Sequence, residues 1–231
     1  HSYSHVFLDI ASKMQASAIK ARFPNIWATC LKAGIDITQE PIPVVPAAHY
    51  FCGGVLVDQW GRSNIENLYV VGEASCTGVH GANRLASTSL LEGLVWGKRA
   101  AGKIEETISQ EPLSKMPCLN DLPTWDESGL VSEPDPALIQ GDMQTIQNIM
   151  WHYVGLVRSA DRLARAIREL RHLWNEIETF YQTTKLSDGL IGLRNAVEVA
   201  LLVAQAAHHN RQSRGCHYRK DSFLSDGGRL I

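Results

Sequence analysis

A glycine loop with polar side chains leads into a helical segment near the middle of the sequence. The loop holds Asn83 and Arg84, and several hydroxyl side chains, among them Ser89, precede the apolar run that begins at Leu90. A guanidinium in a loop of small residues can hold a carboxylate through two parallel hydrogen bonds. The first turn of a helix favours negative charge. The segment therefore predicts a site for an anion or a cofactor.

Two further segments supply groups of the same kind. Glu73 follows the short apolar run 68–72, and an acidic residue at a strand end can accept hydrogen bonds from ribose or ribityl hydroxyls. His49 follows a corner defined by proline and precedes Gly53 and Gly54. Paired glycines in a strand indicate that another backbone or a ligand comes close. Both segments are therefore candidate parts of a ligand site.

Each of these residues also has a purely structural interpretation. A glutamate at a strand end, such as Glu73, is usually solvated, and an isolated histidine such as His49 is more often hydrogen-bonded within the protein. A lone Arg84 would form a surface ion pair, which contributes about 0 to 1 kcal/mol. His80 and Asn83 could satisfy backbone groups of the loop. The leucines that open the helical segment are expected in the core in either interpretation.

Hydrophobic spacing predicts the elements that position these residues. Residues 6–9 resemble a strand, and three-to-four spacing predicts two short helices over residues 12–31, separated by Pro24. The continuous apolar run 68–72 predicts a strand buried on both faces. Residues 85–108 have the composition and spacing of a helix. The first half of the chain is therefore expected to be a mixed α/β segment.

Long helices dominate the second half. Apolar residues at three-to-four spacing over residues 150–181 predict one helix of about eight turns. A second predicted helix follows the turn at 187–189, and residues 137–149 could form a helix before both. Residues 109–136 contain five of the nine prolines, which indicates a connection. The sequence therefore predicts a linker followed by a three-helix bundle.

Composition excludes several classes of partner. The 22 basic and 24 acidic residues lack the basic excess of a nucleic-acid binder. No uninterrupted run of about 18 apolar residues and no secretory signal pattern occurs. The five cysteines form no CxxC pair, and His208 and His209 lack the spacing of a helical metal site. We therefore expect free thiols, no metal, no nucleic acid and no membrane, in a cytoplasmic or plastid location.

The motifs together resemble the succinate dehydrogenase and fumarate reductase flavoprotein family. The resemblance rests on PAAHYFCGG, LYVVGEAS and HGANRLASTSLLEGLVWG, and it continues through FLDI, LPTWDES, MWHYVGLVR and SRGCHYRKD. The PAAHY and WDES segments look like the family members that oxidise L-aspartate. The resemblance implies FAD-dependent conversion of L-aspartate to iminoaspartate, a step of NAD biosynthesis, with oxygen or fumarate as the acceptor.

The same resemblance implies roles for individual residues. His49 and Arg84 would bind the carboxylates of the dicarboxylate substrate and would converge on one pocket beside the flavin ring. The Glu73 carboxylate would hold the ribityl and ribose region of FAD, while the helix start would support negative charge on the reduced ring. Five residues are expected to bind the cofactor: Glu73, Asn83, Ser89, Leu90 and Gly53.

The resemblance also implies how the chain is divided. Residues 1–50 would end the capping (substrate) domain, 51–108 would form the carboxy-terminal part of the FAD-binding domain, and 109–231 would form a linker and a helical domain. The expected fold class is α/β plus all-α. No GxGxxG motif, which would bind the ADP moiety, occurs in the sequence. The chain is therefore expected to bind FAD only in part, to need an amino-terminal half as its partner, and to be a poor enzyme alone.

Two other functions remain open. Succinate dehydrogenases share the GANR and SLL motifs, so a flavoprotein of the succinate dehydrogenase or fumarate reductase type is the alternative enzyme. Turnover of succinate without turnover of aspartate would identify it. The chain could also be an inert structural module that needs an amino-terminal partner. Flavin absorbance in proportion to purified chain would argue against that interpretation.

Overall fold

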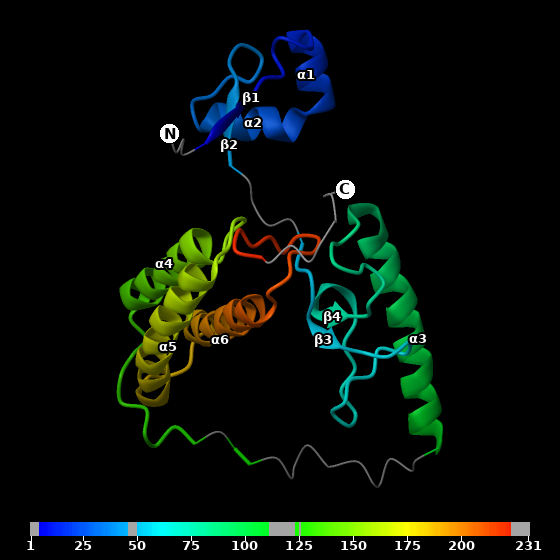
Figure 1. The fold of residues 1–231 in the computed structure, drawn as a ribbon, viewed down its shortest axis with the longest axis vertical. Coiled ribbons are helices and arrows are strands. Elements are labelled where there is room, and N and C mark those ends of the chain that lie inside the picture. Colours follow the sequence, from blue (N-terminus) through cyan, green and yellow to red (C-terminus); the bar gives the residue numbers. More distant parts are fainter. Residues whose placement is uncertain (1–4, 46–49, 111–122, 125, 223–231) are drawn as a thin grey trace. The chain divides into compact units, whose positions relative to one another are not determined.

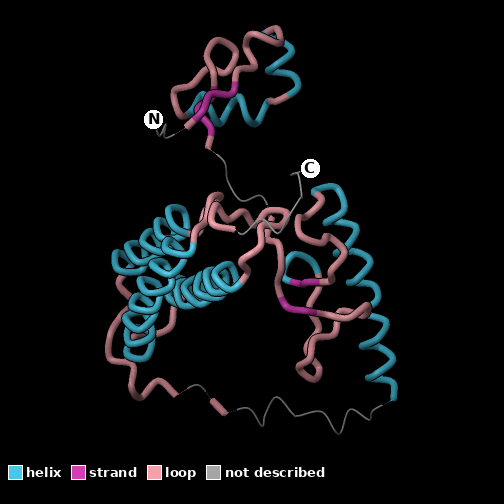
Figure 2. The backbone as a smooth tube through the Cα atoms, viewed as in Figure 1, coloured by secondary structure: helices cyan, strands magenta, loops and turns pink. Residues whose placement is uncertain are grey.

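The computed structural model describes residues 5–45, 50–110, 123–124 and 126–222. The chain divides into two compact units, residues 1–50 and residues 51–231. Helices dominate both units, and every described strand has only two or three residues (Figures 1 and 2). The cysteines that the structure describes are free thiols: Cys30, Cys52, Cys76 and Cys216.

The first unit combines an antiparallel ribbon with two helices. Strand β1 (Val6–Leu8) pairs with β2 (Ile42–Val44). Helix α1 (Ala16–Arg22) is followed directly by α2 (Pro24–Lys32). Pro24 opens α2 because proline lacks the N–H that an inner turn would use, so it is tolerated in a first turn. The predicted strand and the predicted pair of helices are both confirmed.

The second unit begins with a close approach of two backbone segments. Strand β3 (Val55–Leu56) lies parallel to β4 (Ser75–Cys76). At Gly54, just before β3, φ is +126°, and a Cβ atom would lie 2.3 Å from the carbonyl oxygen of Ala74. A side chain at this position would therefore collide with the backbone. The paired glycines mark an approach of backbone to backbone, which is one of the two outcomes that the sequence predicts.

The strand predicted over residues 68–72 is wrong. In the described part of the chain this run makes one isolated antiparallel bridge, between Arg62 and Tyr69. A 3-10 turn, η1 (Gly72–Ala74), follows the run, and Val71 is 40% exposed. A strand that is buried on both faces needs neighbouring strands and covering helices. Among the described residues the run is hydrogen-bonded to residues 61–63 along one edge, and Leu68 and Val71 are each 40% exposed.

Three helices pack against one another and contain the main core of the second unit. They are α4 (Pro136–Tyr153), α5 (Ala160–Thr183) and α6 (Asp188–His209), and they lie side by side in Figure 1. Their buried apolar side chains form one cluster, which includes Ile146, Ile149, Leu163, Ala166, Leu170, Ile177, Leu193, Val197 and Ala204.

The single helix predicted over residues 150–181 is interrupted. Residues 154–159 separate α4 from α5, and the Ser159 hydroxyl accepts a hydrogen bond from the backbone N–H of Arg162. An N-cap of this kind satisfies a donor that the helix itself leaves without an acceptor. Val154, within the break, is also buried. The apolar spacing therefore continues through the break and does not reveal it.

Helix α6 follows the turn that the sequence predicts. The Ser187 hydroxyl caps it by accepting a hydrogen bond from the backbone N–H of Leu190 at 3.2 Å. By length and composition alone, α6 could also cross a membrane. One side of the helix, with Leu193, Val197 and Ala204, is buried against α4 and α5. This is the position of a core helix in a globular domain.

Replacing Leu170 by alanine is expected to lower the free energy of unfolding by about 2 to 5 kcal/mol, because the truncation leaves a cavity between packed helices. Leu170 is 0% exposed. The matched control is Leu202→Ala on α6, where the leucine is 66% exposed and the expected change is within about 0.5 kcal/mol. Urea unfolding followed by far-UV circular dichroism compares the variants. Equal stabilities would contradict the placement of Leu170 in the core.

Candidate functional site

The polar loop leads into helix α3 (Ser89–Gln110) through a 3-10 turn, η2 (Ala86–Thr88). Ser89 is buried, and its hydroxyl donates a hydrogen bond to the carbonyl oxygen of Leu85 at 3.2 Å. Leu90 is 78% exposed. The first turn of a helix leaves backbone N–H groups without intrahelical acceptors. The start of α3 thus presents the Leu90 side chain to solvent, while Ser89 stays buried.

The leucines in the first turns of α3 are exposed, and their expected place in the core is wrong. Leu91 is 60% exposed and Leu94 is 71% exposed. Helix α3 packs through another side against η1 and η2. The described residues therefore leave an apolar surface uncovered at the start of this helix.

Arg84 lies in a buried cluster around Glu92, a residue of α3. The Arg84 guanidinium Nη1 is 3.2 Å from Glu92 Oε2, and the two side chains are 5% and 1% exposed. His80 Nε2 is 2.8 Å from the same oxygen, and the Thr77 hydroxyl donates to Glu92 Oε1 at 2.5 Å. Arg84 therefore forms a buried ion pair with the helix that follows it. The purely structural alternative expected a surface ion pair instead.

Hydrogen bonds from the loop converge on the Glu92 carboxylate in this cluster. The backbone N–H of Leu85 donates to His80 Nδ1 at 3.2 Å, so Nε2 carries the ring proton and donates to Glu92. Burial raises the pKa of the Glu92 carboxyl, but the hydrogen bonds from Thr77 and His80 and the charge of Arg84 outweigh burial. The pKa of Glu92 therefore lies below its ordinary value, and the carboxylate is ionised at neutral pH.

Glu73 lies in η1, beside the start of α3. Its Oε1 accepts a hydrogen bond from the backbone N–H of Phe51 at 2.8 Å, and the residue is exposed. A Cβ atom at Gly93 would lie 3.8 Å from the Cα atom of Gly72, so η1 crosses the first turns of α3. An accessible carboxylate and an accessible helix start thus lie on neighbouring backbone segments.

For three other predicted site residues, the structure gives no contact that bears on substrate or cofactor binding. His49 lies outside the described residues, so its convergence with Arg84 stays a prediction. Asn83 is exposed in the loop, and Gly53 is partly buried with φ of +126°. The proposed contacts of both residues with a cofactor also stay predictions.

The described residues fit one edge of a flavin dinucleotide. An exposed carboxylate such as Glu73 can accept hydrogen bonds from sugar hydroxyls, and the start of α3 offers N–H donors to an electron-rich ring. The uncovered leucines beside that helix start offer an apolar surface against which a ring or another segment can pack. The described residues therefore offer groups of suitable chemistry for part of a flavin dinucleotide, whereas the sequence has no GxGxxG loop for the pyrophosphate.

A turn near the end of the described chain contacts the same loop. In this tail turn (residues 214–217) the backbone N–H of Cys216 donates to the carbonyl oxygen of Ala82 at 3.2 Å. Gly215 has φ of +56°, and a Cβ atom there would lie 2.1 Å from the same oxygen. Arg219 fixes the tail by donating to the carbonyl oxygen of His208 at the end of α6. Sequence spacing could not reveal the contact, because its partners are 134 positions apart.

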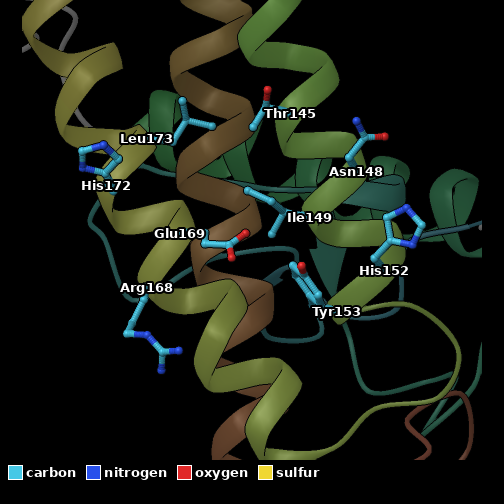
Figure 3. Close-up of a pocket in the computed structure, with 9 residues that line it drawn as sticks. All are labelled: Thr145, Asn148, Ile149, His152, Tyr153, Arg168, Glu169, His172 and Leu173. Carbon is cyan, nitrogen blue, oxygen red and sulfur yellow. The ribbon is translucent and has the colours of Figure 1, made fainter.

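A separate cavity of about 560 Å³ lies between α4 and α5 (Figure 3). Polar and apolar side chains from both helices line it, and none of them is a predicted site residue. The cavity therefore does not belong to the candidate site. Its lining residues are Thr145, Asn148, Ile149, His152, Tyr153, Arg168, Glu169, His172 and Leu173.

Two family descriptions match the chain. "FAD binding domain" matches residues 2–90, and "Fumarate reductase flavoprotein C-term" matches residues 143–226. An L-aspartate oxidase of Pseudomonas aeruginosa is 46% identical over 94% of the chain, and a chloroplastic L-aspartate oxidase of Oryza sativa is 41% identical over 94%. The chain spans 39% and 35% of these two proteins, about two fifths of their length or less.

A solved structure has the same fold. The quinol fumarate reductase of E. coli matches all of the chain with a TM-score of 0.74 and 26% sequence identity, and 41% of that protein is covered. Because the match covers the whole chain, it includes both the short strands and the helices. The fold, mixed helical with few strands, is therefore similar to that of a fumarate reductase flavoprotein.

Proposed function

Because the chain belongs to the succinate dehydrogenase and fumarate reductase flavoprotein family, we propose that it is the carboxy-terminal part of an FAD-dependent L-aspartate oxidase. One observation carries the choice within the family. L-Aspartate oxidases are 40 to 46% identical to the chain, whereas solved succinate dehydrogenase and fumarate reductase structures are 26 to 28% identical. The higher identity favours aspartate over succinate as the substrate.

In the proposed reaction L-aspartate is oxidised to iminoaspartate, as a step of NAD biosynthesis. Bound FAD would accept the hydride, and oxygen or fumarate would reoxidise it. Arg84 and His49 would bind the two carboxylates of the substrate and hold it against the ring. Glu73 would accept hydrogen bonds from the sugar hydroxyls of the cofactor, and the backbone at Ser89 and Leu90 would donate to the pyrimidine edge.

We assign three functional parts to the chain. The division between Tyr50 and Phe51 supports a capping domain that ends near residue 50. The packing of η1 and η2 on α3 supports an FAD-binding part over residues 51–108. The common core of α4, α5 and α6 supports a three-helix bundle within residues 109–231. The remaining cofactor contacts are assigned to the part of the relatives that lies outside the aligned region.

The partners proposed are a small dicarboxylate and the rest of the flavoprotein. The plant relatives named as chloroplastic support a plastid location for plant proteins of this type, and a cytoplasmic location is proposed otherwise. Neither a nucleic acid nor a membrane is proposed as a partner.

Activity of the full-length protein tests this function. The purified protein should be yellow, and it should convert L-aspartate to iminoaspartate, detected as oxaloacetate and ammonia after hydrolysis. Hydrogen peroxide should form when oxygen is the acceptor. Turnover of succinate without turnover of aspartate would contradict the proposal and identify the alternative enzyme.

The 231-residue chain alone should bind little FAD. Its sequence supplies hydroxyl-binding and ring-binding groups but no GxGxxG loop, so the pyrophosphate lacks its usual partner. The absorbance of flavin relative to protein after purification in excess FAD measures this. Stoichiometric flavin would show that the residues of this chain suffice for binding.

A further inference from the structure

A buried carboxylate that the proposed function leaves unassigned lies near the start of α3. The side chain of Glu92 is 1% exposed. A buried carboxylate is costly unless paired charges and hydrogen bonds offset its loss of water. Its partners among the described residues, Thr77, His80 and Arg84, belong to the loop of residues 77–84, which follows β4. Glu92 therefore ties that entire loop to the helix.

Glu92 places a negative charge beside the Arg84 guanidinium. Arg84 Nη1 lies 3.2 Å from Glu92 Oε2, and His80 Nε2 lies 2.8 Å from the same carboxylate oxygen. A guanidinium carries its five N–H donors in one plane, and the nearby charge of Glu92 restricts the orientation of that plane. A side chain that is already oriented loses less conformational freedom when it binds a ligand.

We propose that Glu92 is a positioning residue, which holds the Arg84 guanidinium in the plane from which it binds a substrate carboxylate. The proposal rests on the proposed function, since it takes Arg84 as the residue that binds the dicarboxylate. Glu92 acts through Arg84 and does not touch the substrate. The negative charge of Glu92 is needed for this role, because a neutral group would hold the guanidinium more weakly.

Substitution of Glu92 in the full-length, FAD-loaded protein tests the proposal. Glu92→Gln keeps the shape and removes the charge, so it should raise the dissociation constant of succinate, a dicarboxylate probe, by about 10- to 100-fold. The value of kcat/KM for L-aspartate should fall by a similar factor, with the flavin content unchanged. Glu92→Asp keeps the charge but retracts the carboxylate, and a loss of about 5-fold or more is expected.

Glu105→Gln is the matched control, because Glu105 is exposed on the same helix. This control should leave the dissociation constant of succinate and the kcat/KM for L-aspartate within about 2-fold of the values of the unsubstituted protein. Titration calorimetry with succinate gives the dissociation constant without turnover. If Glu92→Gln does not fold, Glu92→Asp decides alone.

A double-substitution cycle separates positioning from a merely structural role. In an Arg84→Lys background, Glu92→Gln should lower kcat/KM by only about 2-fold more, because its effect travels through the guanidinium. If Glu92→Gln lowers kcat/KM in the Arg84→Lys background as much as it does in the unsubstituted protein, the proposal is overturned. The proposal is also overturned if Arg84→Lys alone impairs turnover while both Glu92 variants leave the dissociation constant of succinate unchanged. Unchanged turnover in Arg84→Lys would overturn the role of Arg84 itself, and with it this proposal.

Discussion

Replacing Arg84 by lysine in the full-length protein should lower kcat/KM for L-aspartate by about 100-fold to 10,000-fold and leave the flavin content unchanged. Lysine keeps the positive charge beside Glu92 but cannot form two parallel hydrogen bonds with a substrate carboxylate. Two charge-assisted hydrogen bonds contribute about 1.5 to 3 kcal/mol each, and about 1.4 kcal/mol corresponds to a tenfold rate change. Steady-state kinetics and flavin absorbance measure the two expectations.

Arg99→Lys is the control for this substitution. Arg99 is exposed on α3, where its guanidinium lies over the ring of Trp96. Its replacement should change kcat/KM by less than about 2-fold, because exposed contacts of this kind contribute little. Equal effects of the two substitutions, or loss of flavin in Arg84→Lys, would remove Arg84 from the proposed substrate site.

Replacing Gly215 by alanine should destabilise the protein by about 2 to 3 kcal/mol and disturb the loop that carries Arg84. The left-handed backbone conformation at Gly215 costs a residue with a Cβ atom about 1 to 2 kcal/mol. The new methyl group would also collide with the Ala82 carbonyl, which breaks a hydrogen bond that contributes about 0.5 to 1.5 kcal/mol. Urea unfolding measures the change in stability.

Gly192→Ala provides the matched control. Gly192 lies within α6, and a Cβ atom there would meet no atom within 4 Å. Alanine is a better helix former than glycine, so this substitution should stabilise the protein by about 0.5 to 1 kcal/mol. A Gly215→Ala protein as stable as the unsubstituted one would mean that the tail turn does not press against Ala82.

Local signals predicted the elements that depend on local contacts. Pro24 marks the boundary between α1 and α2, and Ser187 marks the start of α6, because each residue acts on its own backbone. The break before α5 was missed, since the apolar spacing continues through buried Val154 and only the Ser159 cap distinguishes the two helices. The run 68–72 has strand composition, but a strand also needs neighbours that composition does not supply.

The candidate site was predictable only where its residues are marked by their neighbours in the sequence. Motifs singled out Arg84 and Glu73, whose local surroundings of glycines and short side chains are visible in the sequence. Glu92 was missed because an acidic residue in the first turns of a helix is usually solvated, and only the packed loop reveals its burial. The contact of Gly215 with Ala82 depends on the folded chain and has no counterpart in local spacing.

The tail contact also sets an order of events during synthesis of the protein. Ala82 and Cys216 are 134 positions apart. At about 5 to 20 residues added per second, the ribosome makes the loop on the order of 7 to 27 seconds before it makes the tail turn. A nascent chain therefore contains Arg84 for some time before the backbone beside that arginine gains its partner. The loop reaches its final form only when translation has passed residue 216.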